Sequence, residues 1–101
     1  MKTRSEILRL LALYRPVAEQ RYGLSPMGIF GSVARGEQKE NSDIDIFYVG
    51  DAPSMLTLGK FNNDLEELLG SKVDTVRIRK NMNPLLRERI RQDGIYAKVE
   101  L

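Results

Sequence analysis

The segment 43–49, which reads Asp-Ile-Asp-Ile-Phe-Tyr-Val, constrains the fold of this chain more than any other segment. Its first half alternates between polar and apolar residues and its second half is apolar, which predicts a strand with one functional end. On a strand, Asp43 and Asp45 project from the same face with their Cα atoms about 6.5–7 Å apart. Carboxylates at this spacing can converge on one cation or bridge two, and Mg²⁺ prefers such oxygen ligands. The pair alone is also compatible with the exposed face of an ordinary strand.

A short apolar run at 27–30 precedes this segment and is typical of a buried strand, which Gly31-Ser32 would end. Glycine lets the backbone approach a phosphate closely, and the Ser32 hydroxyl and nearby N–H groups can donate to phosphate oxygens. Residues 33–35 can form one helical turn whose dipole favours an anion. An isolated Gly-Ser is more often a plain strand-ending turn.

The remaining sequence predicts helices around these strands. Residues 3–6 form a capping box that begins a first helix, and Gly23 ends it, while Pro16 should kink it or begin a second short helix. Apolar residues from Leu58 to Leu69 recur at helical spacing up to Gly70.

A third strand is predicted at 72–78, and a last helix should be capped by Asn83 and end at Gly94. Residues 95–99 would add a short edge strand or pack as a tail. The order of elements predicts an α/β fold with a small mixed β-sheet flanked by helices.

Length and composition narrow the class of protein. We expect one domain over residues 1–101, because 101 residues leave no room for a second substrate-binding lobe. No run of 18 apolar residues and no apolar signal core occur, so we expect a cytoplasmic protein without a membrane segment. The absence of cysteine and histidine excludes thiolate or imidazole metal sites and a histidine general base.

The net charge of +2 is unevenly distributed. An acidic cluster at 37–45 is followed by a basic segment at 77–91, which contains Arg77, Arg79, Lys80, Arg87, Arg89 and Arg91. This arrangement suits a metal–polyphosphate site beside a basic surface, although charge alone favours a solvated helix face.

The combination of these segments identifies a protein family far more specifically than any one segment does. The run Phe30–Gly36, followed by Ser42–Ile46, resembles the signature of the polymerase-β-like nucleotidyltransferase superfamily, and specifically its small stand-alone members, the minimal nucleotidyltransferases. The resemblance extends to the flanks, Tyr22-Gly23 and Gly70–Asp74. It implies the nucleotidyltransferase fold and a Mg²⁺-dependent reaction on ATP.

The resemblance also implies roles for individual residues. Gly31 and Ser32 would hold the β- and γ-phosphates, and Asp43 and Asp45 would hold two Mg²⁺ ions. The family has a third carboxylate on a later strand, and Asp74 is the only good candidate for it in this sequence. This carboxylate would bind metal or deprotonate the attacking hydroxyl. By strand alternation Asp74 shares its face with Val76 and Ile78, so that face should be partly buried unless a bulge intervenes.

Two assignments stay open at this stage. Arg35 could contact triphosphate oxygens or brace the polar loop through Glu37 or Glu40, and we favour bracing. Arg77, Arg79 and Lys80 could face the nucleotide or the acceptor, or form a solvated edge.

The biological role implied by the resemblance is that of an antitoxin. Such proteins transfer AMP from ATP to a tyrosine of a partner HEPN-type ribonuclease toxin, with which a hetero-oligomer is expected. The first alternative is a non-catalytic antitoxin that neutralises its toxin by binding. The second is nucleotidyl transfer to RNA or a small molecule; the basic segment permits RNA, but no aromatic-rich recognition motif is present.

Overall fold

A four-stranded mixed sheet with the strand order β3-β2-β1-β4 forms the centre of the molecule. The computed structural model describes residues 2–98. Its elements are α1 (Arg4–Tyr22), β1 (Met27–Phe30), α2 (Gly31–Ala34), β2 (Ile44–Tyr48), α3 (Met55–Leu69), β3 (Val73–Arg77), α4 (Pro84–Asp93) and β4 (Ile95–Tyr96). β1 is antiparallel to both β2 and β4, while β2 and β3 run parallel. The predicted α/β fold with a small mixed sheet is confirmed.

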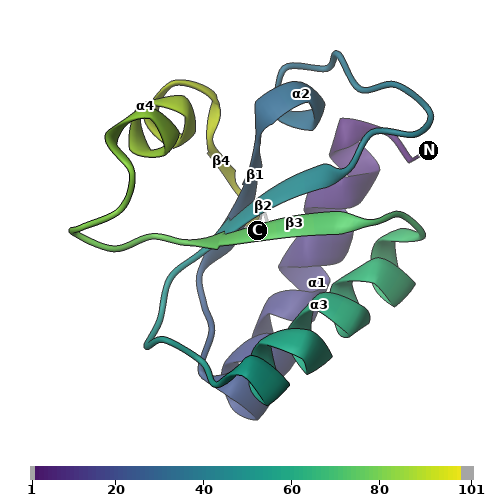
Figure 1. Ribbon diagram of the computed structural model, residues 1–101. Helices are drawn as coiled ribbons and strands as arrows, with labels where there is room; N and C mark the ends of the chain where they lie inside the picture. Colours follow the sequence, from purple (N-terminus) through teal and green to yellow (C-terminus); the bar gives the residue numbers. More distant parts are fainter. Residues whose placement is uncertain (1, 99–101) are drawn as a thin grey trace.

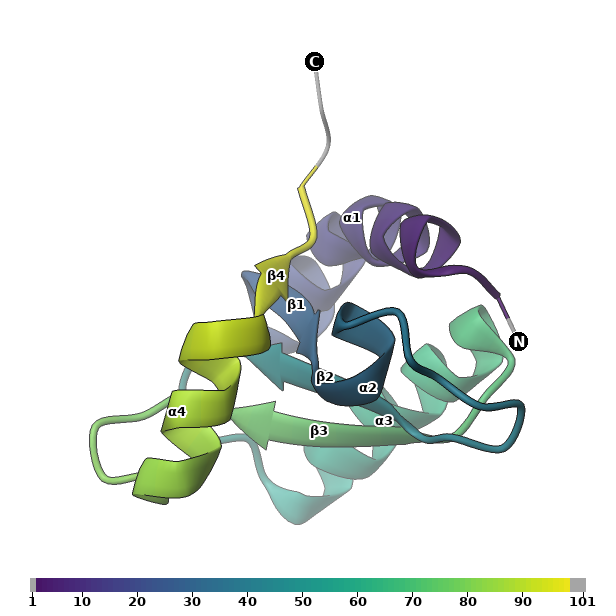
Figure 2. The same ribbon diagram turned by 90° about the horizontal axis from the view of Figure 1, so that it is seen from above.

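The two faces of the sheet have different coverings (Figure 1). Helices α1 and α3 pack on one face, where Ile29, Ile44 and Ile46 are fully buried. Helices α2 and α4 lie on the other side, nearest the viewer in Figure 2. Because successive side chains of a strand alternate between faces, Asp45 and Phe47 of β2 point toward α2 and α4. The aspartate is thus held against a rigid apolar layer.

The helix boundaries agree with the predicted capping signals. Thr3 and Glu6 form the reciprocal capping box at the start of α1, and Gly23 ends that helix in the left-handed conformation. Asn83 caps α4, with Pro84 at its first position. The prediction of a second helix beginning at Pro16 is wrong, because α1 continues through this residue. Pro16 is exposed between the buried Tyr14 and Ala18, whose packing keeps one helix in place.

Two further boundaries differ from the sequence prediction. β2 begins at Ile44, so Asp43 precedes the strand instead of beginning it. The helical turn α2 begins at Gly31 itself, earlier than predicted. β4 covers only Ile95 and Tyr96, and residue 99 of the predicted edge segment lies outside the described residues. Within residues 2–98, no helix is long and apolar enough to cross a bilayer.

Candidate active site

Asp45 and Asp74 are direct partners across the parallel strands β2 and β3. Laterally paired residues place their side chains on the same face of a sheet, so both carboxylates lie on the side of α2 and α4. Asp43 lies two residues before Asp45, just outside the strand. The backbone therefore brings the three predicted carboxylates into one neighbourhood. Asp74 is exposed, while Val76 and Ile78 on its face are half-buried, so no bulge is needed.

Gly31 fits tightly against Asp45. A Cβ atom built on Gly31 would lie 2.3 Å from Asp45 Oδ2, and the φ of Gly31 is +73°, a left-handed conformation that side chains disfavour. The pairing of Phe30 with Asp45 across β1 and β2 explains this contact, because Gly31 directly follows β1. One role of the glycine is thus to leave room for the carboxylate of the neighbouring strand.

The pKa of the Asp45 carboxyl is raised above its ordinary value, mainly because partial burial disfavours the charged form. The negative charges of Asp74 and Asp43 raise it further, and the positive charges of Arg89 and Arg35 oppose the shift. Like charges near one another are stabilised by a cation between them. The electrostatics of the site therefore favour a bound cation.

Among residues 2–98, no three acidic side chains are gathered closely enough to form a ready metal-binding group. The prediction that all three carboxylates share ions thus stays a prediction. Mg²⁺ needs only one or two protein carboxylates when substrate phosphates and water complete its shell. Two carboxylates on adjacent strands, beside a glycine that leaves them space, fit that requirement.

Ser32 offers a free hydroxyl beside the carboxylates. Its carbonyl accepts a hydrogen bond of 2.8 Å from the Glu37 N–H, which fixes the turn after α2. Its side chain is half-buried and has no hydrogen-bond partner in the described part of the chain. The hydroxyl is therefore available to a ligand.

Arg35 makes the bracing contact that the sequence suggested. Its guanidinium donates to Glu37 Oε2 at 2.9 Å and to Asp93 Oδ2 at 2.7 Å. The second contact joins the turn after α2 to α4, an interaction between residues 58 positions apart. Its predicted contact with phosphate remains untested. Sequence reasoning missed Asp93, because nothing in the local pattern reveals that α4 packs beside α2.

The basic segment 77–91 divides into two groups. Arg77 donates to the Gly50 carbonyl, Arg87 donates to the Arg79 and Lys80 carbonyls, and Arg91 forms an ion pair with Glu88. Arg79, Lys80 and Arg89 have exposed side chains without an ion pair among residues 2–98. Arg89 belongs to the site, because its charge acts on Asp45.

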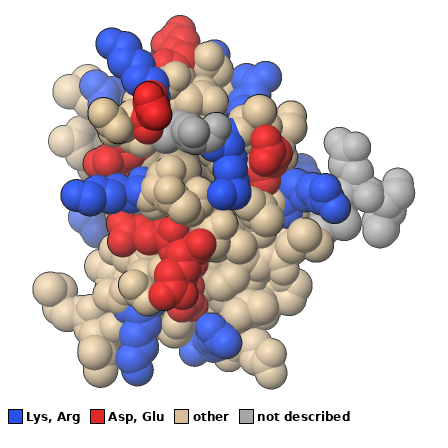
Figure 3. Space-filling model, turned by 90° about the vertical axis from the view of Figure 1, so that its right-hand side faces the viewer, with Lys and Arg blue, Asp and Glu red and all other residues tan. Residues whose placement is uncertain are grey.

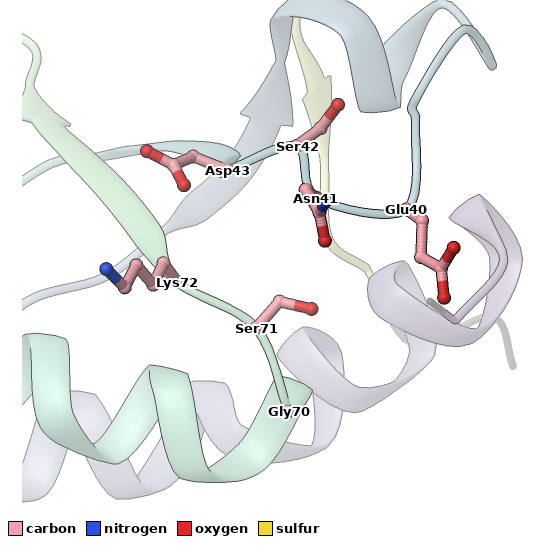
Figure 4. A pocket seen from close by; sticks show the side chains of 7 residues that line it. All are labelled: Glu40, Asn41, Ser42, Asp43, Gly70, Ser71 and Lys72. Carbon is pink, nitrogen blue, oxygen red and sulfur yellow. The ribbon is translucent and has the colours of Figure 1, made fainter.

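A hollow of about 430 Å³ adjoins Asp43 (Figure 4). Glu40, Asn41 and Ser42 line it from the loop before β2, and Gly70, Ser71 and Lys72 line it from the loop between α3 and β3. Figure 3 shows acidic and basic side chains interspersed on this side of the molecule. The hollow is open, polar and next to the carboxylates, so it can admit a hydrophilic ligand.

Comparison with known proteins agrees with this arrangement. Residues 16–98 match the family model described as Polymerase beta, Nucleotidyltransferase. A "putative protein adenylyltransferase" of Methanocaldococcus jannaschii is 42% identical over 97 residues, which cover 95% of this chain and 99% of the relative. Protein adenylyltransferase MntA of Thermococcus cleftensis is 40% identical over 77 residues, covering 75% of this chain and 78% of the relative.

Solved structures that superpose on this fold also include a nucleotidyltransferase and a toxin–antitoxin complex. A "putative minimal nucleotidyltransferase" superposes with a TM-score of 0.67 and 34% identity, covering 91% of this chain and 89% of that chain. A toxin–antitoxin complex with AMP-PNP gives a TM-score of 0.69 and 25% identity, covering 95% of this chain and 73% of that chain.

The fold and the site define a nucleotidyltransferase of small size. The chain belongs to the polymerase beta nucleotidyltransferase family, among its minimal nucleotidyltransferases. The resemblance seen in Phe30–Gly36 and Ser42–Ile46 is confirmed.

Proposed function

We propose that this protein is a Mg²⁺-dependent adenylyltransferase that moves AMP from ATP to a tyrosine hydroxyl of a HEPN-type toxin and so acts as its antitoxin. The observation that carries the proposal is the lateral pairing of Asp45 with Asp74 beside Gly31. Two relatives named as protein adenylyltransferases, one matched over nearly its full length and one over about three quarters, support the reaction. The proposed domain spans residues 1–101, and its proposed location is the cytoplasm, where ATP is available.

Each residue of the site has a task in this proposal. Gly31 and Ser32 bind the β- and γ-phosphates of ATP through backbone N–H groups and the free hydroxyl. Asp43, Asp45 and Asp74 would hold Mg²⁺, which would neutralise phosphate charge and make the acceptor hydroxyl easier to deprotonate. Arg35 braces the turn that carries Ser32, through Glu37 and Asp93. Its cationic group can also face the phosphates.

The reaction itself is an in-line displacement. The acceptor hydroxyl oxygen forms a bond to the α-phosphorus while the bond from that phosphorus to the bridging oxygen breaks, and pyrophosphate leaves with the bond electrons. Asp74, exposed at the outer side of the site, accepts the hydroxyl proton and passes it to water. The remaining residues mainly position and neutralise charge, which is how phosphoryl-group transfer is generally accelerated.

The solved neighbours support a protein acceptor. Residues 2–98 carry the proposed nucleotide site, and we propose that the acceptor is a separate protein that docks beside it. The matched toxin–antitoxin structure with AMP-PNP shows that a neighbour of this fold combines a protein partner with an ATP analogue. We propose a stable hetero-oligomer of the same kind here.

The test is to mix the purified protein with the proposed HEPN-type partner, ATP and MgCl₂, and to weigh the partner by mass spectrometry. The expected result is a gain of one or more AMP units that requires Mg²⁺ and disappears in Asp43→Asn with Asp45→Asn. Neutralisation of the partner's ribonuclease activity without a gain in mass would instead establish the binding-only antitoxin. Labelling of RNA or a small molecule in place of the partner would establish the other alternative.

A further inference from the structure

β3 is an outermost strand of the sheet, and its outer side is not covered by a neighbouring strand (Figures 1 and 2). The Lys72 carbonyl accepts from the Ile44 N–H at 2.9 Å, and the Ile78 N–H donates to the Tyr48 carbonyl at 2.8 Å. Backbone groups alternate in direction along a strand, so the amides of Thr75 and Arg77 point away from β2. Within residues 2–98, neither amide has a hydrogen-bond partner.

This open edge lies beside the active site, because Asp74 is part of it. A strand added to β3 would place the residue opposite Asp74 on the same face of the sheet as that carboxylate. Its side chain would thus be presented to the face that carries Asp45 and Gly31. Strand addition is a common way for a sheet edge to bind an extended peptide.

Unpaired positive charges flank the edge. Lys72 precedes β3, and Arg79 and Lys80 follow it; all three side chains are exposed and have no ion pair among residues 2–98. Cationic residues at an edge discourage pairing with a second copy, whose identical charges would repel. They favour an extended segment that carries acidic residues.

A pocket of about 390 Å³ lies at the end of β3. It is lined in part by Leu58, Val76, Met82 and Leu86, together with Arg77 and Arg79. Because the pocket combines apolar walls with two guanidinium groups, it can anchor one side chain of an acidic segment. The edge and its flanking charges, residues 72–80, are here called the β3 strip, and the pocket adjoins its C-terminal end.

We propose that the acceptor protein delivers its hydroxyl on an extended acidic segment that pairs with the outer edge of β3. The pairing fixes the register, so that the residue opposite Asp74 is the one that receives AMP. This inference rests on the proposed function, since it names how the acceptor of that reaction is held.

Amide hydrogen exchange, followed by NMR, tests the pairing directly. The probe is the HEPN-type protein that serves as the acceptor in the proposed reaction. In the free protein, the amides of Thr75 and Arg77 should exchange quickly and those of Asp74 and Val76 slowly, which gives an internal control. Binding of the partner should slow Thr75 and Arg77 at least ~10-fold. Unchanged exchange at these two amides in a protein that still modifies its partner overturns the β3 strip but leaves the proposed reaction standing.

A charge-reversal pair provides a second measurement. Arg79→Glu with Lys80→Glu should raise the KM for the partner ~10-fold or more and leave the KM for ATP within about twofold. The matched control is Arg9→Glu with Lys98→Glu, which makes the same change in net charge at exposed positions near the other edge of the sheet. An equal effect of both pairs would overturn a specific role for the β3 strip.

Other outcomes are equally decisive. Slowed exchange at Thr75 and Arg77 without any AMP transfer would support the docking and refute the proposed reaction. Slowing that depends only on the concentration of this chain would show that two β3 edges pair with each other, and slowing by RNA would show a nucleic-acid partner. Either result would overturn the docking of an extended segment of the acceptor protein.

Discussion

Asp45 of β2 and Asp74 of β3 lie directly opposite each other in a parallel pair of strands, with Asp43 two residues before the first. A partly buried carboxylate beside two others is unfavourable for folding when no cation is present. Without a cation, the three carboxylates of the proposed site therefore lower the free energy of unfolding.

The first prediction concerns this cost. The pKa of Asp45 is raised in the folded protein, so the free energy of unfolding falls as pH rises from the ordinary value of 3.8 through the raised value. Without Mg²⁺ at neutral pH, Asp45→Asn should raise Tm by roughly 2–4 °C, which corresponds to about 0.5 kcal/mol for a small domain. Calorimetry with and without MgCl₂ checks this. The prediction fails if Mg²⁺ stabilises the wild type and Asp45→Asn equally.

The second prediction separates two effects of replacing a glycine, namely backbone strain and a clash of the new Cβ atom with a neighbouring residue. Gly31 and Gly36 both have a φ of +73°, but only at Gly31 would a Cβ meet another residue within 4 Å. Gly31→Ala and Gly36→Ala should each destabilise the fold by ~1–2 kcal/mol through left-handed strain. Only Gly31→Ala forces the Asp45 carboxylate to turn away, which should reduce the rate of AMP transfer ~100-fold.

Denaturant unfolding and a transfer assay on the same two variants measure these effects. Equal loss of transfer in both would mean that Gly31 acts through its backbone conformation alone.

The third prediction concerns the polar link between α1 and α3. Asp64 Oδ2 accepts from the Tyr14 hydroxyl at 2.8 Å, the Tyr22 hydroxyl at 2.9 Å and Arg21 at 3.3 Å. Asp64→Ala leaves two phenols without this acceptor and should destabilise the protein by about 2–3 kcal/mol in urea titrations. Glu67→Ala, an exposed change on the same helix, is the control and should have an effect below ~0.5 kcal/mol.

The fourth prediction follows from the same link at alkaline pH. Burial and the Asp64 contacts raise the pKa of Tyr14 above its ordinary value of 10.0, and the pKa of Tyr22 is raised for the same reasons. The stabilisation is complete below pH 10 and is lost as pH rises through the folded values. Tyr14→Phe should therefore lose less stability than the wild type between pH 9 and pH 11, measured by thermal unfolding at each pH.

The fifth prediction decides the role of Arg35. If it only braces α2 against α4, then Arg35→Gln and Asp93→Asn should raise the KM for ATP by similar factors, and the double variant should add little. If Arg35 also binds phosphate, Arg35→Gln should be at least ~10-fold worse than Asp93→Asn. Steady-state kinetics of the two single variants and the double variant provide the comparison.

Local signals predicted most of the secondary structure. The capping box at Thr3, the glycines at 23 and 70, and Asn83-Pro84 all act within one turn, so the sequence reveals them. Of the two outcomes predicted for Pro16, the second helix is wrong because the packing of α1 against the core outweighs a missing amide donor, and the kink stays a prediction. The start of β2 shifted by one residue because only pairing with β3 defines where the strand begins.

The site was predictable only in part. Asp43, Asp45 and Gly31-Ser32 are close in the sequence, and spacing alone puts them together. The pairing of Asp74 with Asp45 depends on the parallel register of two strands joined by α3, which no local pattern encodes. The same holds for Arg89 and Asp93, because the packing of α4 beside α2 is a tertiary contact.

The edge position of Asp74 has a functional consequence. The residue is exposed on a terminal strand and its side chain contributes nothing to the core, so its replacement leaves the architecture intact. In the proposed reaction, one substitution at Asp74 would therefore abolish AMP transfer and leave the proposed docking edge, and with it the binding of the partner, in place.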